Sequence, residues 1–107
     1  MKLSEAMKEG YKSVNQIERH FLIQTENKGL CGCALGIASI GFQPLNGPLD
    51  CEKRMKDLEA AFPELQRVKF TRRRNDPTPL WTKIVVWNDC DHLPIDTIIS
   101  RLEEVGL

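Results

Sequence analysis

The stretch PTPLWTKIVVWNDCDHLPIDTIISRLEEVGL, residues 77–107, decides the fold. Apolar side chains recur every three or four positions in each of its halves, which predicts one helix near 79–89 and another at 94–105. Only residues 89–93 separate the two patterns, too few for an extended connection. We therefore expect the two helices to fold back on each other or to cross as a helical hairpin.

The ends of these two helices carry residues that favour helix starts and stops. Thr78 can cap the first helix, and Pro79 can take its first position, where a missing N–H costs nothing. Asp96 suits the first turn of the second helix because a carboxylate there interacts favourably with the helix dipole, and Gly106 ends the pattern.

The upstream chain predicts three further helices, near 4–14, 31–40 and 51–61. Ser4 and Asp50 are suitable N-caps for the first and the third. Small residues dominate the second, which predicts a buried central helix that a neighbour approaches closely. They are Gly32, Cys33, Ala34, Gly36, Ala38 and Gly41.

Glycine inside that central helix needs a reason of its own. A helical glycine costs roughly 1 kcal/mol relative to alanine, so Gly36 is predicted to sit where a side chain would clash. A phosphate-binding glycine loop is the alternative, but the GK[ST] signature that it requires does not follow. Packing is the favoured interpretation.

Extended structure is predicted only as a minor component. Residues 20–24 are apolar and precede a turn-rich segment, and apolar and basic residues alternate within 67–71, so the two segments can pair as a two-stranded ribbon. No alternation of βαβ units is visible. The predicted fold is a mostly α single domain, residues 1–107, built as a small bundle of four to five helices with this ribbon.

Composition limits location and partners. Fifteen basic and fifteen acidic residues cancel, so no overall charge attracts the chain to nucleic acid or to an anionic membrane. The N-terminal segment is charged, and the longest apolar run, residues 30–42, is too short to span a bilayer. We expect a cytoplasmic protein with reduced cysteines and no membrane association.

Four side chains could together bind a metal, namely Cys31, Cys33, Cys90 and His92. Their CxC and CxH spacings differ from the usual two-residue zinc knuckle, and Cys33 lies in an apolar helical pattern where a thiol behaves as a small hydrophobe. Buried or incidental thiols are the favoured interpretation. Cys90, Asp91 and His92 could pair a thiol with an imidazole, but consecutive residues rarely point at one another and nothing supplies an oxyanion hole, so no catalytic residue and no cofactor is predicted.

Asn88 and Asp89 have a structural explanation, because short polar side chains bond to nearby backbone and tolerate turns. They are expected to end one helix and to connect it to the next. Trp81, Trp87 and Tyr11 are expected in the core or at its rim.

Arg72, Arg73 and Arg74, called the arginine cluster below, are the predicted partner-binding residues. Three adjacent cations repel one another, while an acidic protein surface or a phosphate backbone would favour them. A helix–turn–helix DNA reader in the last quarter is disfavoured, since residues 88–107 hold five acids and one base. If nucleic acid is bound, the cluster is expected to bind it.

The segments LSEAMKEG, CALGIA, FPEL and WNDCDHLPIDTIISRLEEVG extend over most of the chain. Together they resemble a group of small uncharacterised bacterial and phage proteins with LSEAIR, CALGAA and LND…IADWLE motifs. Cys33 to Ala38 match the CALGAA position, Asn88 and Asp89 match the ND of LND, and Ile98 matches a buried position of the last helix. The resemblance implies a helical fold and no established activity.

Many of those relatives also carry a CPxC pair before the LND motif and flanking histidines, a set that suits zinc. Here no cysteine precedes the motif closely, and Trp87 stands at a histidine position, so the resemblance implies at most a degenerate zinc-binding domain. The sequence therefore favours a non-catalytic interaction module, a phage- or prophage-encoded regulator that binds a host protein. The alternatives are a nucleic-acid-associated protein and the degenerate zinc-binding domain.

Overall fold

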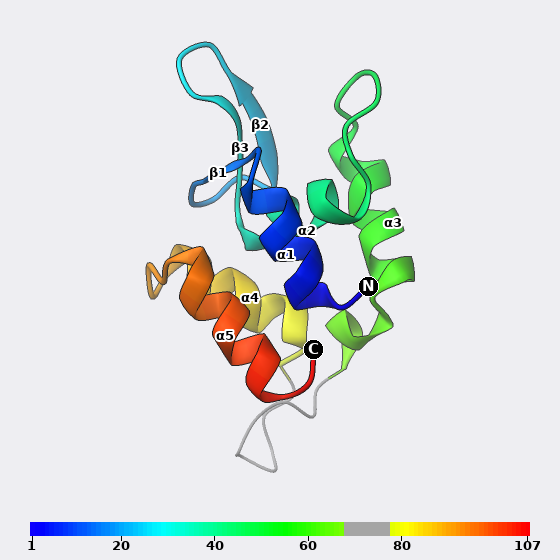
Figure 1. The fold of residues 1–107 in the computed structure, drawn as a ribbon, viewed down its shortest axis with the longest axis vertical. Coiled ribbons are helices and arrows are strands. Elements are labelled where there is room, and N and C mark those ends of the chain that lie inside the picture. The colour runs from blue at the N-terminus through cyan, green and yellow to red at the C-terminus, as the bar shows by residue number, and fades with distance from the viewer. Residues whose placement is uncertain (68–77) are drawn as a thin grey trace.

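The computed structural model describes residues 1–67 and 78–107. These residues form a mostly α fold with a small three-stranded sheet beside the helices, as predicted for the fold class (Figure 1). In chain order the elements are α1 Leu3–Tyr11, β1 Asn15–Gln16, β2 Leu22–Thr25, β3 Gly29–Gly32, α2 Ala34–Phe42, α3 Cys51–Ala61, the 3-10 helix η1 Pro63–Gln66, α4 Leu80–Asp89 and α5 Ile95–Glu104.

Helices α1 and α2 pack backbone against backbone. A Cβ atom added to Gly10 would lie 1.8 Å from the carbonyl oxygen of Ile37, and one added to Gly41 would lie 1.7 Å from that of Ala6. Contacts this short leave no room for a side chain, so both positions require glycine. The predicted close approach of a neighbouring helix is confirmed at Gly41.

Gly36 is also crowded, but by a different element. Its added Cβ would lie 1.6 Å from the carbonyl oxygen of Phe21, in the segment that leads into β2. The prediction that a side chain would clash at Gly36 is confirmed, and the neighbour is extended backbone rather than a helix.

The sheet has the order β1-β3-β2, with β3 parallel to β1 and antiparallel to β2. The extended segment near 20–24 overlaps β2, which pairs with β3 in a hairpin that was not predicted. Of the predicted strand 67–71, Arg67 lies outside any strand, and residues 68–71 fall outside the described residues.

The sheet also corrects the start of the central helix. Residues 31 and 32 belong to β3, and α2 begins only at Ala34. A run of small apolar residues satisfies both helix and strand patterns, and hairpin pairing with β2 decides in favour of the strand.

The capping predictions were partly right. The Asp50 carboxylate accepts from Lys53 N at 3.1 Å and caps α3 as expected. The Thr78 cap was wrong, because Pro79 itself occupies the N-cap of α4 and helix geometry begins at Leu80. Ser4 lies inside α1 instead of capping it, and its hydroxyl donates to Leu107 O at 3.0 Å.

One hydrophobic core joins all five helices and β2. Its largest fully buried side chains include Leu3 and Met7 from α1, Leu35 and Ile37 from α2, Leu58 from α3, Ile84 from α4, and Ile95, Ile98 and Leu102 from α5. Within the described ranges, no helix is long and apolar enough to cross a membrane.

Candidate functional site

Asn88, near the end of α4, is a fully buried polar residue whose side-chain amide is completely hydrogen-bonded. Its oxygen accepts from Ala34 N at 3.1 Å and from Gln16 Nε2 at 2.9 Å. Its nitrogen donates to Ile17 O at 2.9 Å and to Asp89 Oδ1 at 2.7 Å. Two donors and two acceptors are the whole capacity of an amide, so Asn88 has none left for a ligand.

Gln16 on β1 extends this network to α5. Its oxygen accepts from Ile95 N at 2.8 Å, and its nitrogen also donates to Leu93 O at 2.8 Å. The N-cap residues of α2 and α5, Cys33 and Pro94, provide no side-chain cap of their own. Asn88 and Gln16 therefore cap two helices from distant positions in the chain. We call Gln16, Asn88 and Asp89 the polar junction.

Asp89 completes the polar junction by accepting from Arg19 N at 3.0 Å. Arg19 has a positive φ of 67°, a conformation that this bond helps to hold. The predicted structural role of Asn88 and Asp89 is confirmed. Their partners differ from the nearby backbone that was expected, because they lie in β1, in Ile17 and Arg19, and at the start of α2.

An open pocket of about 470 Å³ lies beside the polar junction, and Glu18 and His92 are on its rim. His92 Nδ1 contacts the Glu18 carboxylate, and both side chains are exposed. His92 also has a positive φ of 54° in the turn between α4 and α5.

The three cysteines considered above as metal ligands lie in different environments. Cys31 is buried in β3, Cys33 is buried at the N-cap of α2, and Cys90 is exposed at the end of α4. Burial raises the pKa of the Cys33 thiol above its ordinary value of 9.0, and this outweighs backbone N–H groups of Gly36 and Leu35 that favour the thiolate. In residues 1–67 and 78–107, no three or more His, Cys, Asp or Glu side chains gather as a metal would require.

The predicted partner-binding residues Arg72, Arg73 and Arg74 lie outside the described residues. Among the described residues that flank them, Leu80 N donates to Arg67 O at 2.9 Å. Leu80 and the neighbouring Leu65 are both buried. Arg67 and Leu80 are thus held together where η1 meets α4.

Of the three aromatic residues expected in the core or at its rim, only Trp87 packs against the core. Trp81 and Tyr11 are exposed, at 39% and 46%. Trp87 is half-buried, and the guanidinium carbon of Arg101 lies 5.2 Å from the centre of its ring, a cation–π contact between α4 and α5.

Arg54 on α3 is a buried cation that sequence reasoning missed. It is only 8% exposed, and its Nη1 donates to Gln43 O at 2.7 Å and to Ser39 Oγ at 3.2 Å. Gln43 is the C-cap residue of α2, so the cation lies at the negative end of that helix dipole. The signal was present, because Arg54 falls on the same helical stripe as the inward-facing Cys51 and Leu58.

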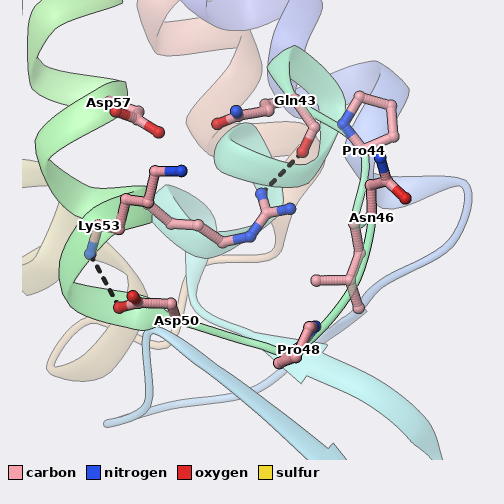
Figure 2. Close-up of a pocket in the computed structure, with 9 residues that line it drawn as sticks. Gln43, Pro44, Asn46, Pro48, Asp50, Lys53 and Asp57 are labelled. Carbon is pink, nitrogen blue, oxygen red and sulfur yellow. Dashed lines mark hydrogen bonds between the residues drawn. The ribbon is translucent and has the colours of Figure 1, made fainter.

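Arg54 also lines a pocket of about 260 Å³ between α3 and the α2–α3 connection. Figure 2 shows Lys53 and Asp57 of α3 on one side of it and Gln43, Pro44 and Asn46 on the other.

Comparison with known proteins assigns no family: no family model and no curated protein matches the sequence, and no solved structure matches the fold. The resemblance to the small bacterial and phage proteins therefore stays a prediction.

Proposed function

We propose that this protein is a non-catalytic interaction module that binds an acidic surface of a partner protein through the arginine cluster. The observation that carries the proposal is the Leu80 N to Arg67 O bond, which joins two described residues on either side of the segment that contains the cluster. This bond brings Arg67 and Leu80 together at the junction of η1 and α4. A net-neutral chain with three adjacent arginines in its sequence has a local feature suited to carboxylates.

Asn88 and Gln16 already use their side chains to hold the fold together. This favours a binding function over a catalytic one. Asn88 uses all four of its hydrogen-bonding positions, and Gln16 holds the first amide of α5. The raised pKa of Cys33 keeps that thiol protonated at neutral pH, whereas a nucleophilic cysteine needs its thiolate.

The proposed setting is the bacterial cytoplasm, with the chain encoded by a phage or prophage and directed at a host protein. The motif resemblance supports this origin. The short apolar runs of the sequence support the location.

The test compares two triple variants of equal charge change. In the first, Arg72, Arg73 and Arg74 become Ser; in the control, the exposed Lys8, Lys28 and Lys56 become Ser. A partner captured from bacterial lysate is identified, purified and titrated calorimetrically with parent and variants. We expect the cluster variant to bind at least tenfold more weakly, while unfolding changes by about 0.5 kcal/mol or less per site.

Two outcomes would contradict the proposal. One is that the control variant weakens partner binding as much as the cluster variant does. The loss of binding would then follow from net charge alone. The other is capture that nuclease abolishes, together with binding to DNA or RNA that weakens steeply with salt, which would favour the nucleic-acid alternative.

A further inference from the structure

Arg54 has hydrogen-bonding capacity that the fold does not use. A guanidinium carries five N–H donors, and the two bonds to Gln43 and Ser39 both come from Nη1. The Nε donor and both Nη2 donors have no protein partner. Nε and Nη2 form one edge of the guanidinium plane, and this edge matches the two oxygens of a carboxylate.

The free edge opens into the 260 Å³ pocket. No buried side-chain nitrogen or oxygen of the described residues lacks a hydrogen-bond partner, so the unpartnered Nε and Nη2 must reach solvent, and Arg54 lines this pocket. A buried cation without a counter-ion is costly. In the described chain no carboxylate lies within ion-pair distance of Arg54, and the α2 C-terminus offsets only part of that cost.

The other charges on the pocket wall narrow the class of ligand. Lys53 and Arg54 are balanced by Asp50 and Asp57, so a multiply charged phosphate would meet two carboxylates. Asp50 already caps α3, whereas Asp57 has neither a hydrogen bond nor an ion pair. Asp57 follows Arg54 by three residues on α3, a spacing that places their Cβ atoms about 5–6 Å apart on one helix face.

We propose that this pocket binds a small zwitterion of the free α-amino-acid class, with its carboxylate on Nε and Nη2 of Arg54 and its ammonium on Asp57. The two charges of such a molecule are separated by a few bonds, and Arg54 and Asp57 line the same small pocket. The pocket is smaller than the roughly 300–1,000 Å³ of sites for drug-sized ligands, which also favours a small molecule. This site is independent of the arginine cluster.

The competing explanation is an internal one, in which Asp57 swings onto Arg54 and neutralises it. The two explanations make opposite predictions for Asp57→Asn. If Asp57 competes for Arg54, the substitution strengthens carboxylate binding. If Asp57 holds the ammonium, it weakens binding of an amino acid and leaves binding of a simple carboxylate unchanged.

The experiment follows the Arg54 Nε–H resonance by ¹⁵N NMR during titration with glycine, acetate and methylammonium chloride. We expect a saturable shift with glycine, a weaker one with acetate by roughly threefold, and none with methylammonium. Asp57→Asn should make glycine and acetate equal. Arg54→Lys keeps the charge but lacks the fork and the Nε–H, so it is followed by the backbone amide resonances of the pocket residues Lys53 and Asp57, and it should lose saturable binding of both ligands.

Lys56→Gln, which removes an exposed cation from the same helix, is the matched control and should bind like the parent. The proposal is overturned if the Arg54 resonance stays fixed or moves without saturation in the parent protein. It is equally overturned if Asp57→Asn strengthens acetate binding, or if Lys56→Gln weakens glycine binding as much as Arg54→Lys. Because the parent titration needs no variant, misfolding of Arg54→Lys would not prevent a decision.

Discussion

The two ends of α2 are both held by a polar side chain from another helix, yet the two arrangements differ. At the N-terminus, the neutral amide of Asn88 accepts from Ala34 N and is completely hydrogen-bonded and buried. At the C-terminus, the Arg54 cation donates to Gln43 O but keeps three unused donors beside an open pocket. A neutral polar group can be fully buried once all its hydrogen bonds are made. A cation without a counter-ion keeps access to water.

The comparison separates two uses of a buried polar residue. The polar junction gives its full bonding capacity to the fold and thereby connects β1, α2, α4 and α5. Arg54 gives the fold one nitrogen and leaves one edge for a ligand. Substitutions at the two ends of α2 should therefore affect stability very differently.

The largest effect is expected for Asn88→Leu. Leucine is close in size to asparagine but leaves Ala34 N and Ile17 O buried without partners, and each orphaned group costs about 1–3 kcal/mol. We expect a total loss of roughly 3–5 kcal/mol in urea unfolding. Gln24→Ala, at an exposed position of β2, is the control and should change little. A loss below about 1 kcal/mol would mean that water or a local shift replaces the amide.

Arg54→Met should have a smaller effect. Two hydrogen bonds are lost, but the cost of burying the cation disappears with them, so we expect a loss of about 1–2 kcal/mol in the same assay. A loss as large as that of Asn88→Leu would remove the distinction between the two ends of α2.

The smallest effect concerns Cys33, beside the polar junction, and depends on pH. Because burial raises the folded-state pKa of this thiol, the folded state holds the proton more tightly than the unfolded state. The resulting stability is fully present below pH 9.0 and is lost as pH rises through the folded-state pKa. We therefore measure the free energy of unfolding of the parent and of Cys33→Ala in urea at neutral and at alkaline pH. The two values should converge or cross at alkaline pH, relative to their difference at neutral pH.

Cys90→Ala is the matched control, since it removes an exposed thiol from the same chain. A difference in unfolding free energy between parent and Cys33→Ala that stays constant from neutral to alkaline pH would contradict the prediction. It would show that the N-terminus of α2 is more accessible to solvent than the structure indicates.

Local signals predicted most of the helices. The spacing of apolar residues located α3, α4 and α5 to within one or two residues, and the Asp50 cap and the Gly106 stop were both right. Gly36 was also understood from the sequence, because a helical glycine that is costly by propensity implies a close neighbour.

Long-range pairing was harder to predict. The assignment of residues 31 and 32 to β3 depends on β2 across a hairpin and on a two-residue β1, which no local pattern shows. The caps that Asn88 and Gln16 provide join residues more than fifty positions apart, so the sequence indicated a polar turn but not its partners. Arg54 was missed because a single basic residue on an apolar stripe resembles an ordinary surface position.

The caps supplied by the polar junction also have a consequence for hydrogen exchange. First-turn amides of a helix have no partner within the helix and usually exchange quickly with solvent. Ala34 N and Ile95 N are instead bonded to Asn88 and Gln16, which belong to other elements. Their protons can leave only when α2, α4, α5 and β1 separate, so two amides that normally report fraying would here report the cooperative opening of the whole domain.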